Sequence, residues 1–252
     1  MTRAGIIAAG HGERLRAGTG ILKPLVRVEG EALIDRVLAS IAEAGASDVA
    51  IIVNDASLAV RTHVSARRWP FGIDWIVETT PSSMHSFLRV LERLALTGEQ
   101  CGDRGPFLIS TVDTVAPPGA YARFFAEAAR LDADVTLALT PTLDDDKPLL
   151  VEVDGRRVVA LGDAASNATL ATAGYYAVRP SILREADAAR RGGAAALRGF
   201  LARLLERGYR IDGIAVAPSV DVDRPADVET AEAFLRRLPR RSRGAAKAGV
   251  NL

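Results

Sequence analysis

The sequence predicts an α/β fold with a mostly parallel, mixed sheet, and three observations support this. Short apolar runs alternate with segments of helical apolar spacing along the first 140 residues. Beyond residue 140, two apolar runs are joined at Asp154-Gly155, a hairpin signal that predicts a small β-rich piece. The chain has 252 residues, 48% of them hydrophobic, which is enough for one large core. We therefore expect a single domain over residues 1–238, with residues 141–180 as a β-rich insertion.

The expected elements follow one another along the chain. Apolar runs predict the strands of the parallel part, over residues 4–9, 48–53, 73–77, 106–111 and 133–139. Amphipathic periodicity predicts the helices between them, over residues 32–44, 57–67, 86–96 and 118–131. The hairpin 148–161, a strand over 170–178, and helices over 196–207 and 226–237 complete the order. Because parallel strands are buried on both faces, we expect helices on both sides of the sheet.

Composition excludes several classes of protein. The 32 basic residues are balanced by 31 acidic ones, which argues against a nucleic-acid partner. No run approaches the roughly 20 apolar residues of a membrane helix, so no membrane partner is expected. The single cysteine, Cys101, excludes an internal disulfide and fits a cytoplasmic protein. Residues 239–252 lack an apolar period and predict a flexible basic tail. A homo-oligomer is compatible with the sequence, which does not set the oligomeric state.

The stretch "GIIAAGHGERLRAGTGILKPL", residues 5–25, holds the strongest functional signal. Gly10 and Gly12 follow a strand, and their exposed backbone N–H groups suit a phosphate cradle. Leu15 stands where a dinucleotide fingerprint needs a third small residue, and Pro24 follows the lysine where a P-loop needs Ser or Thr. Both of those motifs are therefore disfavoured.

The same stretch resembles the signature G-x-G-x-R-[LM]…K-P-L of the nucleotidyltransferase superfamily, which includes sugar-1-phosphate nucleotidyltransferases and molybdenum-cofactor guanylyltransferases. The match is "AAGHGERL", seven further residues, and "KPL". It implies a Rossmann-like three-layer α/β/α fold. It also implies catalytic roles for Arg14 and Lys23, whose positive charges would meet the triphosphate. The residues that it places around the nucleotide are Ala8, Ala9, Gly10, Gly12 and Glu13.

The resemblance further implies Mg²⁺ held by two aspartates. Asp113 follows the strand 106–111, at the edge where open α/β sheets bind ligands. The segment "VDVDRPADVETAEAFL" resembles the family element "V-D-T-P-E-D-L", which makes Asp223 the second metal ligand and Asp221 its competitor. Both aspartates also have ordinary explanations, a local turn for Asp113 and helix entry for the later segment. Arg224 replaces the usual threonine, so we expect the capping box there to be lost.

The residues that would recognise the base and the acceptor are less clearly marked in the sequence than those that would meet the phosphates. Ser83 and Ser86 in "S-S-M-H-S-F" are candidates for contact with the base or ribose, or for helix capping, and the stretch favours CTP. The segment "TAGYYAVRP" resembles a strand that lines the sugar site of the family, which assigns Gly174 and Tyr175 to the acceptor, with Tyr176 as the alternative. Glu152 is a candidate contact for substrate hydroxyls. The family's "E-K-P" element is replaced by "LGDAASNATL".

The resulting expectation is a Mg²⁺-dependent enzyme that transfers a nucleoside monophosphate to a small phosphorylated molecule. The donor would be a nucleoside triphosphate, the acceptor a phosphorylated sugar, polyol or similar compound, and pyrophosphate would leave. The alternative is a non-catalytic subunit on the same fold that binds a nucleotide or sugar phosphate. Such a subunit usually loses charged residues of the site. All four are present here: Arg14, Lys23, Asp113 and Asp223.

Overall fold

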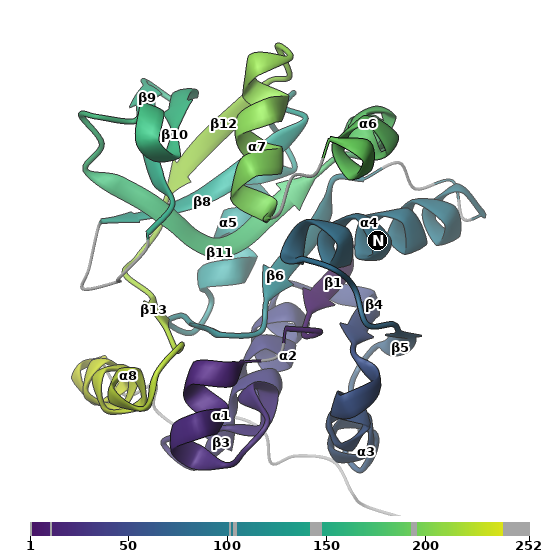
Figure 1. Cartoon of the computed structure of the whole chain (residues 1–252), viewed down its shortest axis with the longest axis vertical. Helices are drawn as coiled ribbons and strands as arrows, with labels where there is room; N and C mark the ends of the chain where they lie inside the picture. The colour runs from purple at the N-terminus through teal and green to yellow at the C-terminus, as the bar shows by residue number, and fades with distance from the viewer. Residues whose placement is uncertain are drawn as a thin grey trace, which may run out of the picture.

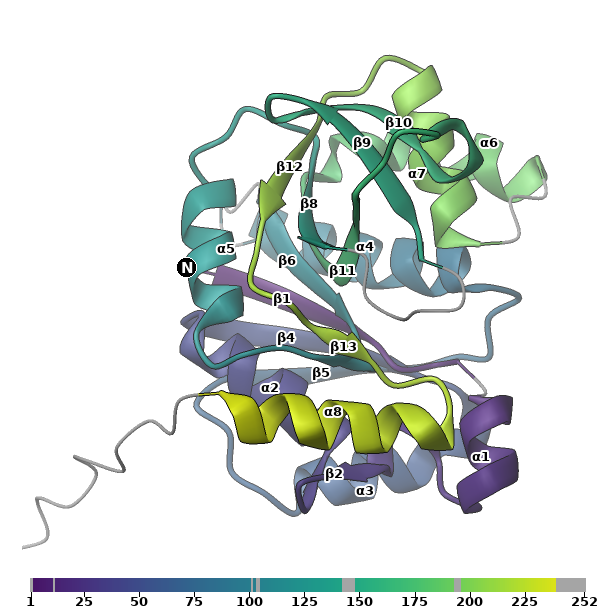
Figure 2. The same ribbon diagram turned by 90° about the vertical axis from the view of Figure 1, so that its left-hand side faces the viewer.

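The computed structural model describes residues 2–10, 12–100, 102, 105–141, 148–192 and 196–238. A nine-stranded mixed sheet crosses the molecule in the order β5-β4-β1-β6-β11-β8-β12-β10-β9, with helices on both faces (Figures 1 and 2). The three-layer α/β/α architecture expected from the sequence is therefore confirmed. Within the described residues, no helix is long and apolar enough to cross a membrane.

The N-terminal half of the sheet is entirely parallel. Its strands are β1 (Thr2–Ile7), β4 (Ala46–Val53), β5 (Gly72–Val77) and β6 (Phe107–Thr111). The helices that connect and cover them are α2 (Leu33–Glu43), α3 (Leu58–Ser65), α4 (Ser83–Gln100) and α5 (Ala120–Ala128). Successive residues of a strand point to opposite faces, so Ile6 packs in the core under α2 and α5 while Ile7 packs under α4. The carboxyl ends of β1 and β6 thus meet at one edge of the sheet.

The C-terminal half is mixed. It contains β8 (Val135–Pro141), β9 (Leu150–Asp154), β10 (Arg157–Leu161), β11 (Leu170–Val178) and β12 (Ile211–Ala215), with helices α6 (Ala186–Arg191) and α7 (Leu197–Glu206). Strand β11 runs antiparallel between β6 and β8, and so joins the two halves. The expected hairpin is present as β9 and β10. The described part of segment 141–180 contributes β9, β10 and β11 to the main sheet, and β12, which the pattern did not predict, lies between β8 and β10.

Several small elements surround the carboxyl edge of the parallel strands. They are α1 (Glu13–Thr19), a 3₁₀ turn (Lys23–Leu25), the hairpin of β2 (Arg27–Val28) and β3 (Glu31–Ala32), and the pair of β7 (Thr114–Val115) and β13 (Val220–Asp221). Helix α8 (Pro225–Arg237) follows β13. A third, smaller core that includes Leu15, Val115 and Val222 holds these pieces together. We expected a glycine turn at residues 10–12, and the structure adds the short helix α1 directly after it.

Candidate active site

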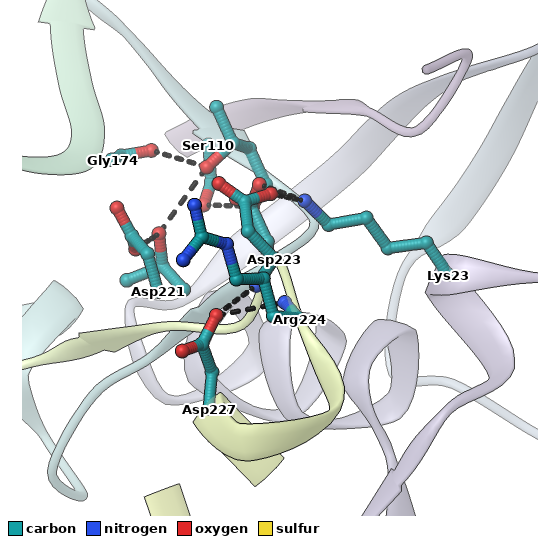
Figure 3. A network of polar contacts seen from close by, with 10 residues as sticks. Lys23, Ser110, Gly174, Asp221, Asp223, Arg224 and Asp227 are labelled. Carbon is teal, nitrogen blue, oxygen red and sulfur yellow. Dashed lines mark hydrogen bonds and ion pairs between the residues drawn. The ribbon is translucent and has the colours of Figure 1, made fainter. Parts of the chain in front are cut away.

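Lys23 lies between two carboxylates that are far away in the sequence. Its Nζ atom is 2.6 Å from Oδ2 of Asp113 and also donates a hydrogen bond to Oδ1 of Asp223 (Figure 3). Only 11% of the Lys23 side chain is exposed. The structure therefore brings together three of the residues that the sequence singled out, one from each of three separate segments.

These contacts change the pKa values of the buried groups. Burial by itself disfavours the charged form of Lys23, but the neighbouring Asp113 and Asp223 outweigh it and raise the pKa of the amine. Burial likewise opposes ionisation of Asp113, but the charge of Lys23 and the hydrogen bonds to the carboxylate lower the pKa of that group. Both groups are therefore charged at neutral pH.

Gly12 allows the chain to approach the stem of Lys23. Its φ of +56° lies in the left-handed region, and a Cβ atom at this position would lie 2.6 Å from Cβ of Lys23. Pro24, buried in the 3₁₀ turn, fixes the backbone that follows the lysine. The second glycine of the sequence motif is thus required by close packing against the lysine as well as by its backbone conformation.

The pairing of β7 with β13 explains why Asp113 and Asp223 meet. Asp221 is opposite Thr114 in this antiparallel ladder, and the backbone N–H of Val222 donates to the carbonyl of Asp113 at 3.1 Å. The Val222 side chain is fully buried in the third core. In an extended segment the residues on either side of Val222 point away from the core that buries it, so Asp221 and Asp223 both line one cavity at this edge of the sheet.

The two competing aspartates have different partners. Asp223 contacts Lys23, whereas Asp221 accepts a hydrogen bond of 2.9 Å from Oγ1 of Thr114 (Figure 3). The structure thus pairs Asp223, and not Asp221, with the lysine that also contacts Asp113. The choice follows from the ladder register, which the sequence alone does not contain.

One expectation about the start of α8 is wrong. Arg224 was expected to abolish the capping box, but the acidic half of the box is present. Oδ2 of Asp227 accepts hydrogen bonds from the backbone N–H groups of Asp223 and Arg224, both at 2.8 Å. This interaction does not depend on the side chain at position 224. It fixes the backbone that carries Asp223.

The cavity beside these groups has a volume of about 460 Å³. Arg14 on α1 and Ser83 at the start of α4 contribute to its wall, as does Tyr176 on β11. The remaining lining residues are Thr111, Asp113, Leu149, Thr172, Ala196, Leu197, Arg198, Asp221, Asp223, Arg224 and Asp227. We call this space the central cavity. Its walls come from both halves of the sheet, and the lining includes charged groups of both signs.

The structure corrects the assignment of the acceptor-side tyrosine. Tyr175 is fully buried on the opposite face of the sheet, where its ring stacks on Tyr121 at 4.2 Å between ring centroids. Tyr176 lines the central cavity instead. Neighbouring residues of a strand face opposite sides, and the sequence motif does not show which side faces the ligand. Gly174 lies close to the site, since a Cβ atom there would be 2.0 Å from Oγ1 of Thr114.

The remaining predicted contacts divide into two groups. Ser83 lines the central cavity, and its Oγ accepts a hydrogen bond of 3.0 Å from the backbone N–H of Leu197. Ser86 is buried and pairs with the Thr80 hydroxyl, which explains it as a structural residue of α4. Glu152 lies on β9, away from the residues that line the central cavity. The last two residues are therefore not placed at the cavity.

The glycine loop is held by a residue that the sequence analysis missed. Asn54, buried at the end of β4, donates from Nδ2 to the carbonyl of Ala9 at 2.9 Å, and the N–H of Ala8 donates to the carbonyl of Ile52. Gly10 is exposed, with open space where a side chain would be. Glu13 is exposed at the start of α1. The only sequence signal for Asn54 was its place directly after a buried strand.

Comparisons with known proteins agree with this geometry. The model of the MobA-like NTP transferase domain matches residues 4–206. The chain is 28% identical over 237 residues to the bifunctional IPC transferase and DIPP synthase of Rubrobacter xylanophilus, covering 91% of this chain and 51% of that protein. It thus spans about half the length of that relative. It is 29% identical over 188 residues to the N-acetylmuramate alpha-1-phosphate uridylyltransferase of Caulobacter vibrioides, covering 70% of this chain and 75% of that protein.

Solved structures share the fold. The inositol-1-phosphate CTP transferase from T. maritima superposes with a TM-score of 0.77 at 18% identity, covering 94% of this chain and 97% of that one. A UTP-bound UGPase from Acinetobacter baumannii gives a TM-score of 0.72 at 14% identity, covering 93% of each chain. The signature residues meet at one cavity and the family model covers most of the sequence. The chain therefore belongs to the MobA-like NTP transferases, a family of nucleotidyltransferases.

Proposed function

We propose that the chain transfers a nucleoside monophosphate from a nucleoside triphosphate to the phosphate of a sugar or polyol, with Mg²⁺ and with release of pyrophosphate. One observation carries this proposal. Lys23 is held by Asp113 and Asp223 beside the central cavity, and Arg14 lines the same cavity. A buried cation and two carboxylates next to a phosphate-binding loop suit chemistry in which two anions must be brought together.

In the proposed reaction, an acceptor phosphate oxygen attacks the α-phosphorus of the triphosphate. A bond forms from that oxygen to the α-phosphorus, and the bond to the bridging oxygen of pyrophosphate breaks. The nucleophile is already an anion at neutral pH, so no general base is required. The barrier is mainly electrostatic, and catalysis consists of positioning and charge stabilisation.

Two cations of the chain would supply that stabilisation. Lys23 would turn its ammonium from the carboxylates to the α-phosphate and the incoming acceptor phosphate. Arg14 would hold the outer phosphates, since its planar guanidinium can donate to two oxygens at once. The backbone N–H groups around Gly10 and Gly12 would cradle the phosphate chain. Because the pKa of Lys23 is raised, its charge does not change across the neutral range.

The residues present fit a magnesium ion. Asp113 and Asp223 converge on a single point, the Nζ atom of Lys23, which shows that both carboxylates can reach one cation. Among the described residues no group of three or more His, Cys, Asp and Glu side chains forms a metal cage. Two carboxylates are enough for Mg²⁺, which commonly binds through one or two of them together with waters and substrate phosphates. When bound, Mg²⁺ would neutralise phosphate charge and orient the reacting groups.

The relatives guide the choice of substrates. One solved relative is named for inositol-1-phosphate and CTP, and one curated relative for N-acetylmuramate alpha-1-phosphate and a uridylyl group. Both names describe an acceptor ring that carries a phosphate. We therefore extend this acceptor class to the present chain, and we keep CTP as the favoured donor on the sequence of residues 82–87.

The non-catalytic alternative is less well supported. A binding subunit has no need of an ion pair between a buried lysine and two acidic residues, yet Lys23 keeps both partners here. The backbone of Asp223 is also fixed, since its N–H donates a hydrogen bond to Oδ2 of Asp227. These interactions favour an enzyme.

A pyrophosphate-release screen tests the proposal. Each of the four common triphosphates would be combined with phosphorylated sugars, polyols and choline-like alcohols in the presence of Mg²⁺, with chelator as the control. We expect release with at least one ring-phosphate acceptor, abolished by chelation. Binding of triphosphate without release for any acceptor would support the binding-subunit alternative instead.

A further inference from the structure

Gly18 on α1 is in unusually close contact with the start of α8. A Cβ atom built on Gly18 would lie 2.5 Å from Cγ of Pro225. Carbon atoms that are not bonded pack best at about 3.5–4.0 Å, so any side chain here would overlap the ring. Because the proline ring is rigid, the overlap cannot be relieved by a change of rotamer.

Both sides of this contact carry residues of the central cavity. Arg14 lies one helical turn before Gly18, on the same face of α1. On the other side, Asp223 and Arg224 directly precede Pro225. Figure 2 shows α1 beside the N-terminal end of α8. The contact thus lies between a cation proposed for the triphosphate and a carboxylate proposed for the metal.

The third core also holds these two segments together. Leu15 on α1 and Val222 before α8 are both fully buried in it. Leu15 is three residues before Gly18, which places both on the side of α1 that faces α8. The separation between α1 and the start of α8 is therefore set at two places, the buried residues Leu15 and Val222 and the contact of Gly18 with Pro225.

We propose that Gly18 is a positioning residue that sets the distance between Arg14 and Asp223. This role rests on the proposed function. Position 18 falls within the seven-residue spacer of the signature, so the motif does not call for glycine there. Helix propensity alone would favour alanine at this exposed helical position. The close approach of Pro225 explains the glycine.

Four variants test this role. Gly18→Ala introduces the overlap, Pro225→Ala removes the ring, and the double variant combines both changes. Gly199→Ala is the matched control, because Gly199 is also a helical glycine but no atom of the described residues outside its own helix lies within 4 Å of its Cβ position. For each, we would measure the affinity for a non-hydrolysable triphosphate, kcat, the KM of both substrates and the melting temperature.

We expect Gly18→Ala to weaken triphosphate binding about tenfold and to lower kcat about 10- to 100-fold, since a displacement of about 1 Å can have such an effect. The acceptor KM should change little, because Thr172 and Tyr176, which we propose border the acceptor, lie on β11 and not on α1. Pro225→Ala in the same chain should restore most of the loss. Gly199→Ala should behave like the wild type.

Wild-type triphosphate binding and kcat in Gly18→Ala would overturn the proposal, as would a double variant that is no better than Gly18→Ala. If Gly18→Ala does not fold, the double variant must fold and bind triphosphate, or the proposal is wrong. A wild-type chain that releases no pyrophosphate with any substrate pair contradicts the proposed function instead. In that case the melting temperatures test the Gly18–Pro225 contact. The change in the double variant must differ from the sum of the changes in the two single variants.

Discussion

The central cavity has a side that we propose binds the phosphates, the phosphate side, and a side that we propose binds the acceptor, the acceptor side. The two are built in different ways. On the phosphate side, Gly12, Arg14 and Lys23 come from one short stretch, and the glycine's contact with Lys23 sets their arrangement. On the acceptor side, Thr172 and Tyr176 come from a strand whose register decides which side chains face the cavity. A sequence motif can therefore describe the first side, whereas the second depends on how the sheet is assembled.

The two sides also differ in the forces that hold them. The phosphate side depends on a buried lysine that forms ion pairs with Asp113 and Asp223, which are 90 and 200 residues away in sequence. The acceptor side is part of a hydrophobic core, where Tyr176 packs edge-on against Phe87 at 6.4 Å between ring centroids. Substitutions on the phosphate side should thus affect chemistry more than stability, and those on the acceptor side should affect both.

The largest expected effect comes from breaking the phosphate side. Lys23→Ala and, separately, Asp113→Ala should each lower the rate of pyrophosphate release by about 10³-fold or more, because a preorganised charge is lost. The melting transition should remain cooperative. Arg16→Ala, at an exposed position of α1, is the control and should keep wild-type activity. Full activity in either site variant would contradict the assignment.

A matched pair of substitutions sharpens the acceptor side. Tyr176→Phe removes a hydroxyl at the cavity wall that hydrogen-bonds Thr172 and that we propose contacts the acceptor. We therefore expect the acceptor KM to rise by about fivefold, in line with one lost hydrogen bond. Tyr175→Phe removes a buried hydroxyl that has no hydrogen-bond partner among the residues that the structure describes. The acceptor KM of this variant should not change, and its stability should be equal to or higher than that of the wild type. Steady-state kinetics and thermal melts measure both. A change in the acceptor KM of Tyr175→Phe, without one in Tyr176→Phe, would contradict our placement of the two rings.

The smallest effect concerns pH. The lowered pKa of Asp113 stabilises the fold above its unfolded value of about 3.9, and this contribution is lost as the pH falls through the folded value. In metal-free buffer, the melting temperature of the wild type should therefore fall further between pH 6 and pH 3 than that of Asp113→Asn. The raised pKa of Lys23 acts at the opposite end, where its contribution is lost only at strongly alkaline pH. Parallel melting curves for both proteins would argue against the ion pair.

Much of the fold was predictable from local patterns. The strands and helices between residues 32 and 139 lie close to their expected positions, because each carries its own apolar period. Strand β12 and the short helix α1 were missed. Helix α1 is only seven residues long and contains Gly18, so it gives little periodic signal. The pairing of β12 between β8 and β10 is a long-range event that no local pattern encodes.

The chemistry that we propose for the phosphate side could be inferred from the sequence, since the spacing of Gly12, Arg14 and Lys23 is local and their proposed roles depend on charge and backbone freedom. The folded chain was needed to see that Asp223 rather than Asp221 contacts the lysine, and that Tyr176 rather than Tyr175 faces the cavity. The physical reason is the same in both cases. Strand pairing sets which contacts each side chain makes. It turns Tyr175 and Tyr176 to opposite faces of the sheet, and it places Asp221 beside Thr114 and Asp223 beside Lys23 although both aspartates line the same cavity.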